Sequence, residues 1–122
     1  MDALRGNFKD TINLLRKATL SRTVNAAKVL SSYHYSRLSK KPAHWALPTS
    51  VSIEPTTSCN LRCPECPSGL RSFTRPTGML QPDLFKKVMD ELSPSLSYLT
   101  FYFQGEPYLH PKFLDLVKYA SD

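Results

Sequence analysis

The three cysteines of this chain, Cys59, Cys63 and Cys66, lie within eight consecutive residues. Thiolates are soft ligands, and so short a loop can bring three of them to one zinc ion or iron–sulfur cluster. The odd number and the clustering argue against a secreted disulfide framework, whose cysteines are usually spread along the chain to join distant loops. The triplet therefore predicts a metal site in a reducing compartment, and we expect a cytoplasmic protein.

The number of available ligands bears on the choice of metal. A structural zinc site needs four ligands, so a histidine would have to complete the set, and His110 is the histidine that we expect nearest to the cysteines. A ferredoxin-type carrier needs a fourth cysteine, which this chain lacks. A [4Fe–4S] cluster held by three cysteines keeps one iron open, as catalytic metal sites do. Spacing alone leaves both zinc and iron–sulfur open.

The basic charge of the chain is confined to its first part. Residues 1–50 carry nine Lys and Arg against two Asp, a net charge of +7, whereas residues 51–122 carry seven against eight acidic residues, a net charge of −1. The charge shift predicts a basic helical extension over residues 1–41. Two prolines and a tryptophan make residues 42–50 a connector, and residues 51–122 then form an α/β region.

Two amphipathic helices are predicted in the extension. Apolar residues recur at helical spacing from Leu4 to Leu15, through Phe8 and Ile12, and a second helix spans about Arg22 to Leu38. Its apolar side is predicted to carry Val24, Ala27, Leu30 and Tyr33 or His34.

Basic amphipathic helices most often cover the edge of a neighbouring domain, and an anionic membrane surface is a less favoured partner. We expect no nucleic-acid partner, because aromatic and basic residues do not interleave. No apolar run approaches the roughly 18 residues that span a bilayer, so we expect no transmembrane segment.

The remaining residues alternate between strand and helix patterns. Strands are predicted over Ser50–Pro55 and Tyr98–Phe103, and helices over residues 82–92 and from Pro111 onward. This order predicts two parallel strands joined by a right-handed crossover, with the helices outside the sheet. Ligand sites in such folds lie in the loops after the strands. The cysteines follow the first strand and Gln104–Pro107 follows the second, so both loops should lie on one edge.

Cys59-x3-Cys63-x2-Cys66 after the first strand, with Gly105-Glu106-Pro107 after the second, resembles the start of the radical S-adenosylmethionine (radical SAM) superfamily. The stretches Ile53–Cys63 and Thr77–Leu80 are similar to the branch that often carries a C-terminal SPASM domain and modifies peptides or proteins. The implied fold is the first two βα units of a partial (β/α)6 TIM-like barrel, preceded by N-terminal helices.

This resemblance implies a role for each motif. The three cysteines would hold a [4Fe–4S] cluster whose open iron chelates SAM, and Gly105, Glu106 and Pro107 would receive the methionine end of SAM. Reductive cleavage of SAM would yield a 5′-deoxyadenosyl radical that abstracts hydrogen from a substrate, with a peptide or protein as the candidate. The implied electron donor is a flavodoxin or ferredoxin. No residue of the chain is assigned as catalytic.

The chain departs from the family pattern in three ways. Glu65 replaces a residue that is commonly aromatic, and Gln104 replaces a glycine, so its backbone cannot freely adopt a positive φ. Two βα units stand where the family has about six, so we expect a fragment that is inactive alone. Two paired strands cover little apolar surface, and Tyr98, Phe101 and Phe103 should lack partners. The alternative is a non-catalytic zinc-binding interaction module that uses the basic helices as its contact surface.

Overall fold

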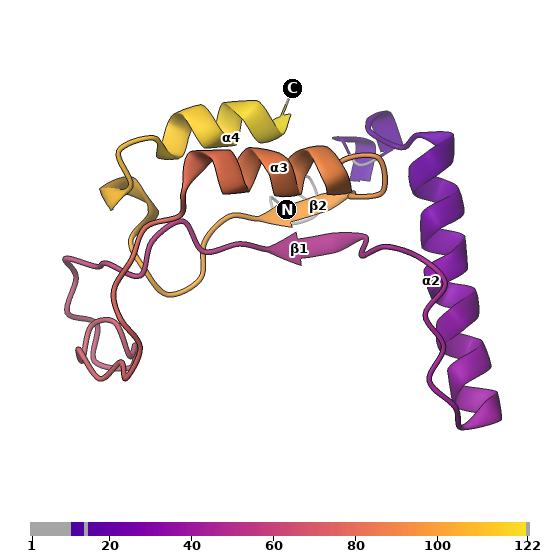
Figure 1. The fold of residues 1–122 in the computed structure, drawn as a ribbon, viewed down its shortest axis with the longest axis horizontal. Coiled ribbons are helices and arrows are strands. Elements are labelled where there is room, and N and C mark those ends of the chain that lie inside the picture. Colours follow the sequence, from indigo (N-terminus) through magenta and orange to yellow (C-terminus); the bar gives the residue numbers. More distant parts are fainter. Residues whose placement is uncertain (1–10, 14, 122) are drawn as a thin grey trace, which may run out of the picture. The chain divides into compact units, whose positions relative to one another are not determined.

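A computed structural model describes residues 11–13 and 15–121 of the chain. Strand, helix, strand and helix follow one another in the predicted order, although both strands are shorter than predicted (Figure 1). The chain divides into two compact units, which we describe separately. The elements are α2 (Leu20–Ser39), β1 (Ser50–Ser52), α3 (Pro82–Leu92), β2 (Tyr98–Thr100), the 3-10 helix η1 (Pro107–Leu109) and α4 (Phe113–Ser121).

The first unit comprises Met1–Ser50 and Leu92–Tyr98. Its helix α2 begins after Thr19, whose hydroxyl accepts a hydrogen bond from the Arg22 backbone N–H at 3.3 Å. The helix ends at Ser39, and Lys40 follows in the left-handed conformation. The second predicted helix is therefore confirmed. Of the first predicted helix, residues 11–13 and 15–16 are helical, and Leu4 and Phe8 lie outside the described residues.

The face of α2 that is covered within this unit is polar rather than apolar. The Asn25 side chain donates to the Leu47 carbonyl at 2.8 Å and accepts from the Leu47 N–H at 3.1 Å. The Ser36 hydroxyl likewise accepts from the Ala43 N–H at 2.9 Å. The connector thus runs along α2 with its backbone groups bonded to side chains of the helix. Small polar residues suit this face because a backbone without a partner strand needs donors and acceptors.

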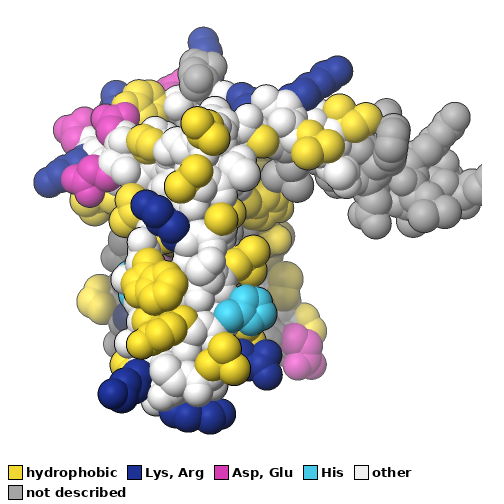
Figure 2. All heavy atoms as spheres, turned by 90° about the vertical axis from the view of Figure 1, so that its right-hand side faces the viewer, with side chains coloured by type: hydrophobic (Ala, Val, Ile, Leu, Met, Phe, Trp, Pro, Cys, Tyr) yellow, Lys and Arg dark blue, Asp and Glu magenta, His cyan; other side chains and the backbone are white. Residues whose placement is uncertain are grey.

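The apolar face predicted for α2 is correspondingly exposed. Val24 is 43% exposed, Leu30 60% and Tyr33 54%. Hydrophobic side chains lie along this helix with Lys and Arg side chains between them (Figure 2). Among the described residues, no helix is both long and apolar enough to cross a membrane.

The second unit comprises Val51–Glu91 and Leu99–Asp122. The two strands pair side by side and run in the same direction (Figure 1). The pairing continues past β1, where the Ile53 N–H donates to the Thr100 carbonyl at 2.9 Å. It then stops before Pro55, which has no N–H to donate to a neighbouring strand.

A row of stacked aromatic rings joins the helices of this unit to the residue after β2. Phe101 lies between Phe85 of α3, at a ring-centroid distance of 4.7 Å, and Phe113 of α4, at 5.4 Å. Phe85 is 1% exposed. The expectation that Phe101 lacks partners is therefore wrong, because α3 and α4 both supply rings to it. Tyr98 and Phe103, by contrast, are 60% and 68% exposed.

Replacing Phe101 with alanine should destabilise the second unit by roughly 2–4 kcal/mol, because it removes the ring that contacts both helices. Phe103→Ala is the matched control and should change stability by less than about 0.5 kcal/mol, since its ring is mostly exposed. Urea unfolding of the two variants measures the difference. Equal stability losses would show that the stacked row does not hold the helices.

Candidate functional site

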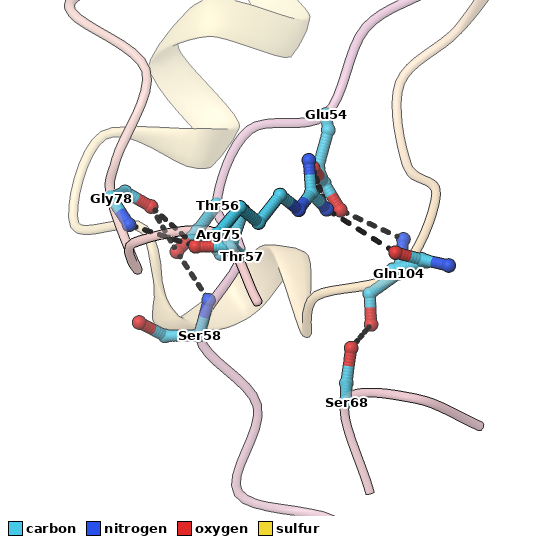
Figure 3. A network of polar contacts seen from close by, with 8 residues as sticks. All are labelled: Glu54, Thr56, Thr57, Ser58, Ser68, Arg75, Gly78 and Gln104. Atoms are coloured by element: carbon cyan, nitrogen blue, oxygen red, sulfur yellow. Dashed lines mark hydrogen bonds and ion pairs between the residues drawn. The ribbon is translucent and has the colours of Figure 1, made fainter. Parts of the chain in front are cut away.

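The cysteines lie on a loop whose two ends are bonded to each other. The Thr57 N–H donates to the Gly78 carbonyl at 3.1 Å, and the Gly78 N–H donates to the Thr57 hydroxyl at 2.7 Å. The Thr56 hydroxyl also donates to the Gly78 carbonyl, at 3.1 Å (Figure 3). In addition, Thr56 forms an antiparallel bridge with Met79. The base of the loop is therefore fixed on both sides of the cysteine triplet.

Within the loop, the chain folds back on itself between the second and third cysteines. The Cys66 N–H donates to the Cys63 carbonyl at 3.3 Å, and the Leu70 N–H donates to the Cys66 carbonyl at 2.9 Å. A β-carbon on Gly69 would lie 2.5 Å from the Cys63 nitrogen and even closer to its carbonyl oxygen. Only glycine fits at position 69, because backbone atoms cannot yield as a flexible side chain can.

All three cysteines are free thiols, with Cys63 exposed and Cys59 and Cys66 half-buried. The backbone N–H groups of Gly69 and Ser68 hydrogen-bond to the Cys66 sulfur and lower the pKa of its thiol, and the Ser68 side chain acts in the same direction. Desolvation opposes this effect without reversing it. The thiolate is the form of cysteine that binds metals, so the fold of the loop favours the form of Cys66 that a metal would need.

The loop after β2 lies directly against the residues that lead into the cysteine loop. The Glu106 N–H donates to the Ser58 carbonyl at 2.9 Å. A β-carbon on Gly105 would overlap the Thr56 carbonyl oxygen and lie 2.7 Å from the Thr56 carbonyl carbon. The predicted adjacency of the two loops is therefore confirmed.

Glycine is needed at position 105 because of close packing. No described glycine has a positive φ, and among the other described residues only Lys40 and Arg71 have one. Gly105 is required for close approach to Thr56 rather than for backbone freedom. Gln104 has no positive φ either, so a glutamine at this position causes no backbone strain.

Glu106 and Pro107 form the start of η1. The Glu106 carboxylate accepts a hydrogen bond from the Tyr108 N–H at 3.2 Å, and Pro107 is the first residue of the helix. Glu106 is half-buried. Its carboxylate serves here as a helix cap, and its predicted role in binding SAM stays a prediction.

His110 is bonded through both ring nitrogens. It is 4% exposed, its Nε2 lies 2.9 Å from the Leu80 carbonyl oxygen, and its Nδ1 accepts from the Lys112 N–H at 3.2 Å. Zinc coordination would break one of these hydrogen bonds and leave a buried polar group without a partner. His110 is thus a poor fourth ligand for the cysteines.

In the part of the chain that the structure describes, no three Cys, His, Asp or Glu side chains are grouped closely enough to hold a metal. A metal would therefore have to draw the cysteines together, as is common where binding and folding are coupled. The donor set itself suits a soft metal centre, because its three thiols are free and one is acidified by backbone N–H groups. The residues present fit a three-thiolate cluster better than a four-ligand zinc site.

Sequence reasoning missed the polar network around this loop. Arg75 forms an ion pair with Glu54 at 2.8 Å, and Gln104 and Ser68 join them (Figure 3). No local pattern predicts these contacts, since the partners lie up to 50 residues apart.

Three known proteins match parts of the chain. A tungsten-containing aldehyde ferredoxin oxidoreductase cofactor-modifying protein from Pyrococcus furiosus is 37% identical over 68 residues, which cover 54% of this chain and 18% of the relative. A PqqA peptide cyclase from Bradyrhizobium diazoefficiens is 35% identical over 79 residues, or 64% of this chain and 20% of the relative. An S-adenosyl-L-methionine-dependent 2-deoxy-scyllo-inosamine dehydrogenase from Niallia circulans is 39% identical over 62 residues, or 48% and 24%.

These relatives are radical SAM family members, and the matches are short. The chain matches only about a fifth of their length. No protein-family model and no solved structure matches the chain.

Replacing Gly105 with alanine should destabilise the junction of the two loops by roughly 1–3 kcal/mol, because the new methyl group meets the Thr56 backbone. Gly78→Ala is the matched control, since a β-carbon there meets nothing within 4 Å. Thermal unfolding and hydrogen exchange of the Glu106 amide measure the effect. Equal behaviour of the two variants would contradict the close packing.

Alkylation of Cys66 should reach its half-maximal rate at a lower pH in the folded protein than in urea. The hydrogen bonds to its sulfur favour the thiolate, so the proton leaves at a lower pH than in the unfolded chain. Rates of iodoacetamide labelling at each cysteine, read by mass spectrometry across a pH series, test this. An unchanged or higher midpoint on folding would show that the N–H groups do not act on the sulfur.

Proposed function

We propose that this chain carries the cluster-binding end of a radical SAM enzyme, with Cys59, Cys63 and Cys66 as ligands of a [4Fe–4S] cluster. The observation that carries the proposal is the packing of Gly105 and Glu106 against Thr56 and Ser58. That packing puts the two sequence motifs next to each other. The matches to three radical SAM proteins support the same conclusion independently.

The chemistry that a bound cluster would supply is one-electron reduction of SAM, which releases methionine and a 5′-deoxyadenosyl radical able to take hydrogen from a substrate. The residues of the chain bind and orient. The loop offers three thiols and stabilises the thiolate of Cys66. Glu106 would offer a carboxylate oxygen to the methionine ammonium group, and Gly105 lets the Glu106 backbone lie beside the start of the cysteine loop.

The wider features of the enzyme belong to the same proposal. They comprise a partial (β/α)6 barrel, a SPASM-type branch, a flavodoxin or ferredoxin as electron donor and a cytoplasmic location. A peptide or protein is the proposed substrate, and one relative is named as a peptide cyclase. Another relative is named for a small molecule, 2-deoxy-scyllo-inosamine. The choice of a peptide or protein as substrate therefore rests on the sequence similarity of Ile53–Cys63 and Thr77–Leu80 to the SPASM-type branch.

The zinc alternative is disfavoured by His110. Both of its ring nitrogens are bonded inside the second unit, so it is not free to supply a fourth ligand. The cysteines alone give three ligands. Three ligands suit a centre with one open position.

Anaerobic reconstitution with iron and sulfide should give a brown protein with about four irons per chain, whose visible absorption bleaches with dithionite. Cys59→Ser, Cys63→Ser and Cys66→Ser should each lose most of the bound iron, because a three-cysteine cluster has no ligand to spare. Ser72→Ala is the control within the same loop and should keep it. A colourless protein that binds zinc through the same cysteines would overturn the proposal.

A further inference from the structure

Gln104 contacts three separate segments of the second unit. Its N–H donates to Glu54 Oε1 at 3.1 Å, and its carbonyl accepts from the Ser68 hydroxyl at 2.6 Å. Its side-chain Oε1 accepts from Arg75 at 3.2 Å. Figure 3 shows these groups converging on Gln104 from the chain before, within and near the end of the cysteine loop. The main-chain N–H, the main-chain carbonyl and the side-chain Oε1 of Gln104 therefore each bond a different segment of the chain.

Glu54 is similarly engaged through both of its oxygens. While Oε1 accepts from Gln104, Oε2 lies 2.8 Å from the Arg75 guanidinium. The Glu54 side chain is 15% exposed and that of Arg75 is 46% exposed. An ion pair at this depth contributes modestly by itself, and the shared contacts to Gln104 are what make the arrangement specific.

The Ser68 contact connects this network to a cysteine. Ser68 is 7% exposed, and its hydroxyl is bonded to Gln104. Ser68 lies two residues after Cys66, inside the turn that the Leu70 N–H closes by donating to the Cys66 carbonyl at 2.9 Å. The main-chain carbonyl of Gln104 is therefore bonded to the turn that directly follows Cys66, and Gln104 also directly precedes Gly105.

We propose that Glu54, Arg75 and Gln104 form a latch that fixes Cys66 in place relative to Gly105 and Glu106. The glutamine that replaces the usual glycine then supplies a side chain that holds the end of the cysteine loop. All three are positioning residues. The latch itself follows from the contacts, and its effect on a metal centre rests on the proposed function.

Hydrogen exchange of the metal-free protein tests the latch. Arg75→Met and Gln104→Met should each speed exchange of the Cys66 and Leu70 amides about two- to fivefold, with α3 amides unchanged. Arg75→Lys should restore part of the protection, because it keeps a donor and a positive charge. Arg62→Met and Gln81→Met are matched controls, since both side chains are exposed and lie outside the latch.

The same variants, reconstituted with iron and sulfide, give the second readout. Arg75→Met and Gln104→Met should lose iron to a chelator at least about twice as fast as the controls. Unchanged loop exchange, or faster exchange throughout α3 as well, would overturn the latch. Faster loop exchange with unchanged iron loss would overturn its positioning role alone. If the unsubstituted protein binds no iron, the proposed function fails and the exchange data decide the latch.

Discussion

The close approach of Gly105 to the Thr56 carbonyl is the constraint on which the rest of the site depends. No other residue leaves room for that carbonyl, and the Glu106 N–H reaches Ser58 only because the two backbones are this near. Ser58 is the last residue before Cys59. The glycine therefore sets how closely the loop after β2 approaches the start of the cysteine loop.

The cysteine loop is fixed at its base and open at its thiols. Hydrogen bonds between Thr57 and Gly78 close the base, whereas the three cysteines are free thiols that form no disulfide. This division suits a metal centre, because metal–thiolate bonds can supply the free energy that gathers the ligands once their loop is in place. Backbone N–H groups directed at Cys66 lower the cost of forming its thiolate, which is the form that a metal would bind.

Each of the two units is stabilised by a different kind of internal contact. In the second unit, the Phe85, Phe101 and Phe113 rings supply apolar packing between strand and helices. In the first, Asn25 and Ser36 bond the backbone of the connector to α2. A helix that lies against an unpaired backbone needs polar and small side chains on that face, so its apolar stripe is left on the surface.

The sequence by itself determined the order of strands and helices, the cysteine triplet and the motif that follows the second strand. These depend on periodicity and on residue types within a few positions of each other. Only the tertiary structure decided that Phe101 has partners, that His110 is already bonded and that Gln104 joins Glu54 and Arg75. Such contacts link residues far apart in sequence, and they depend on the path of the backbone, which no local pattern records.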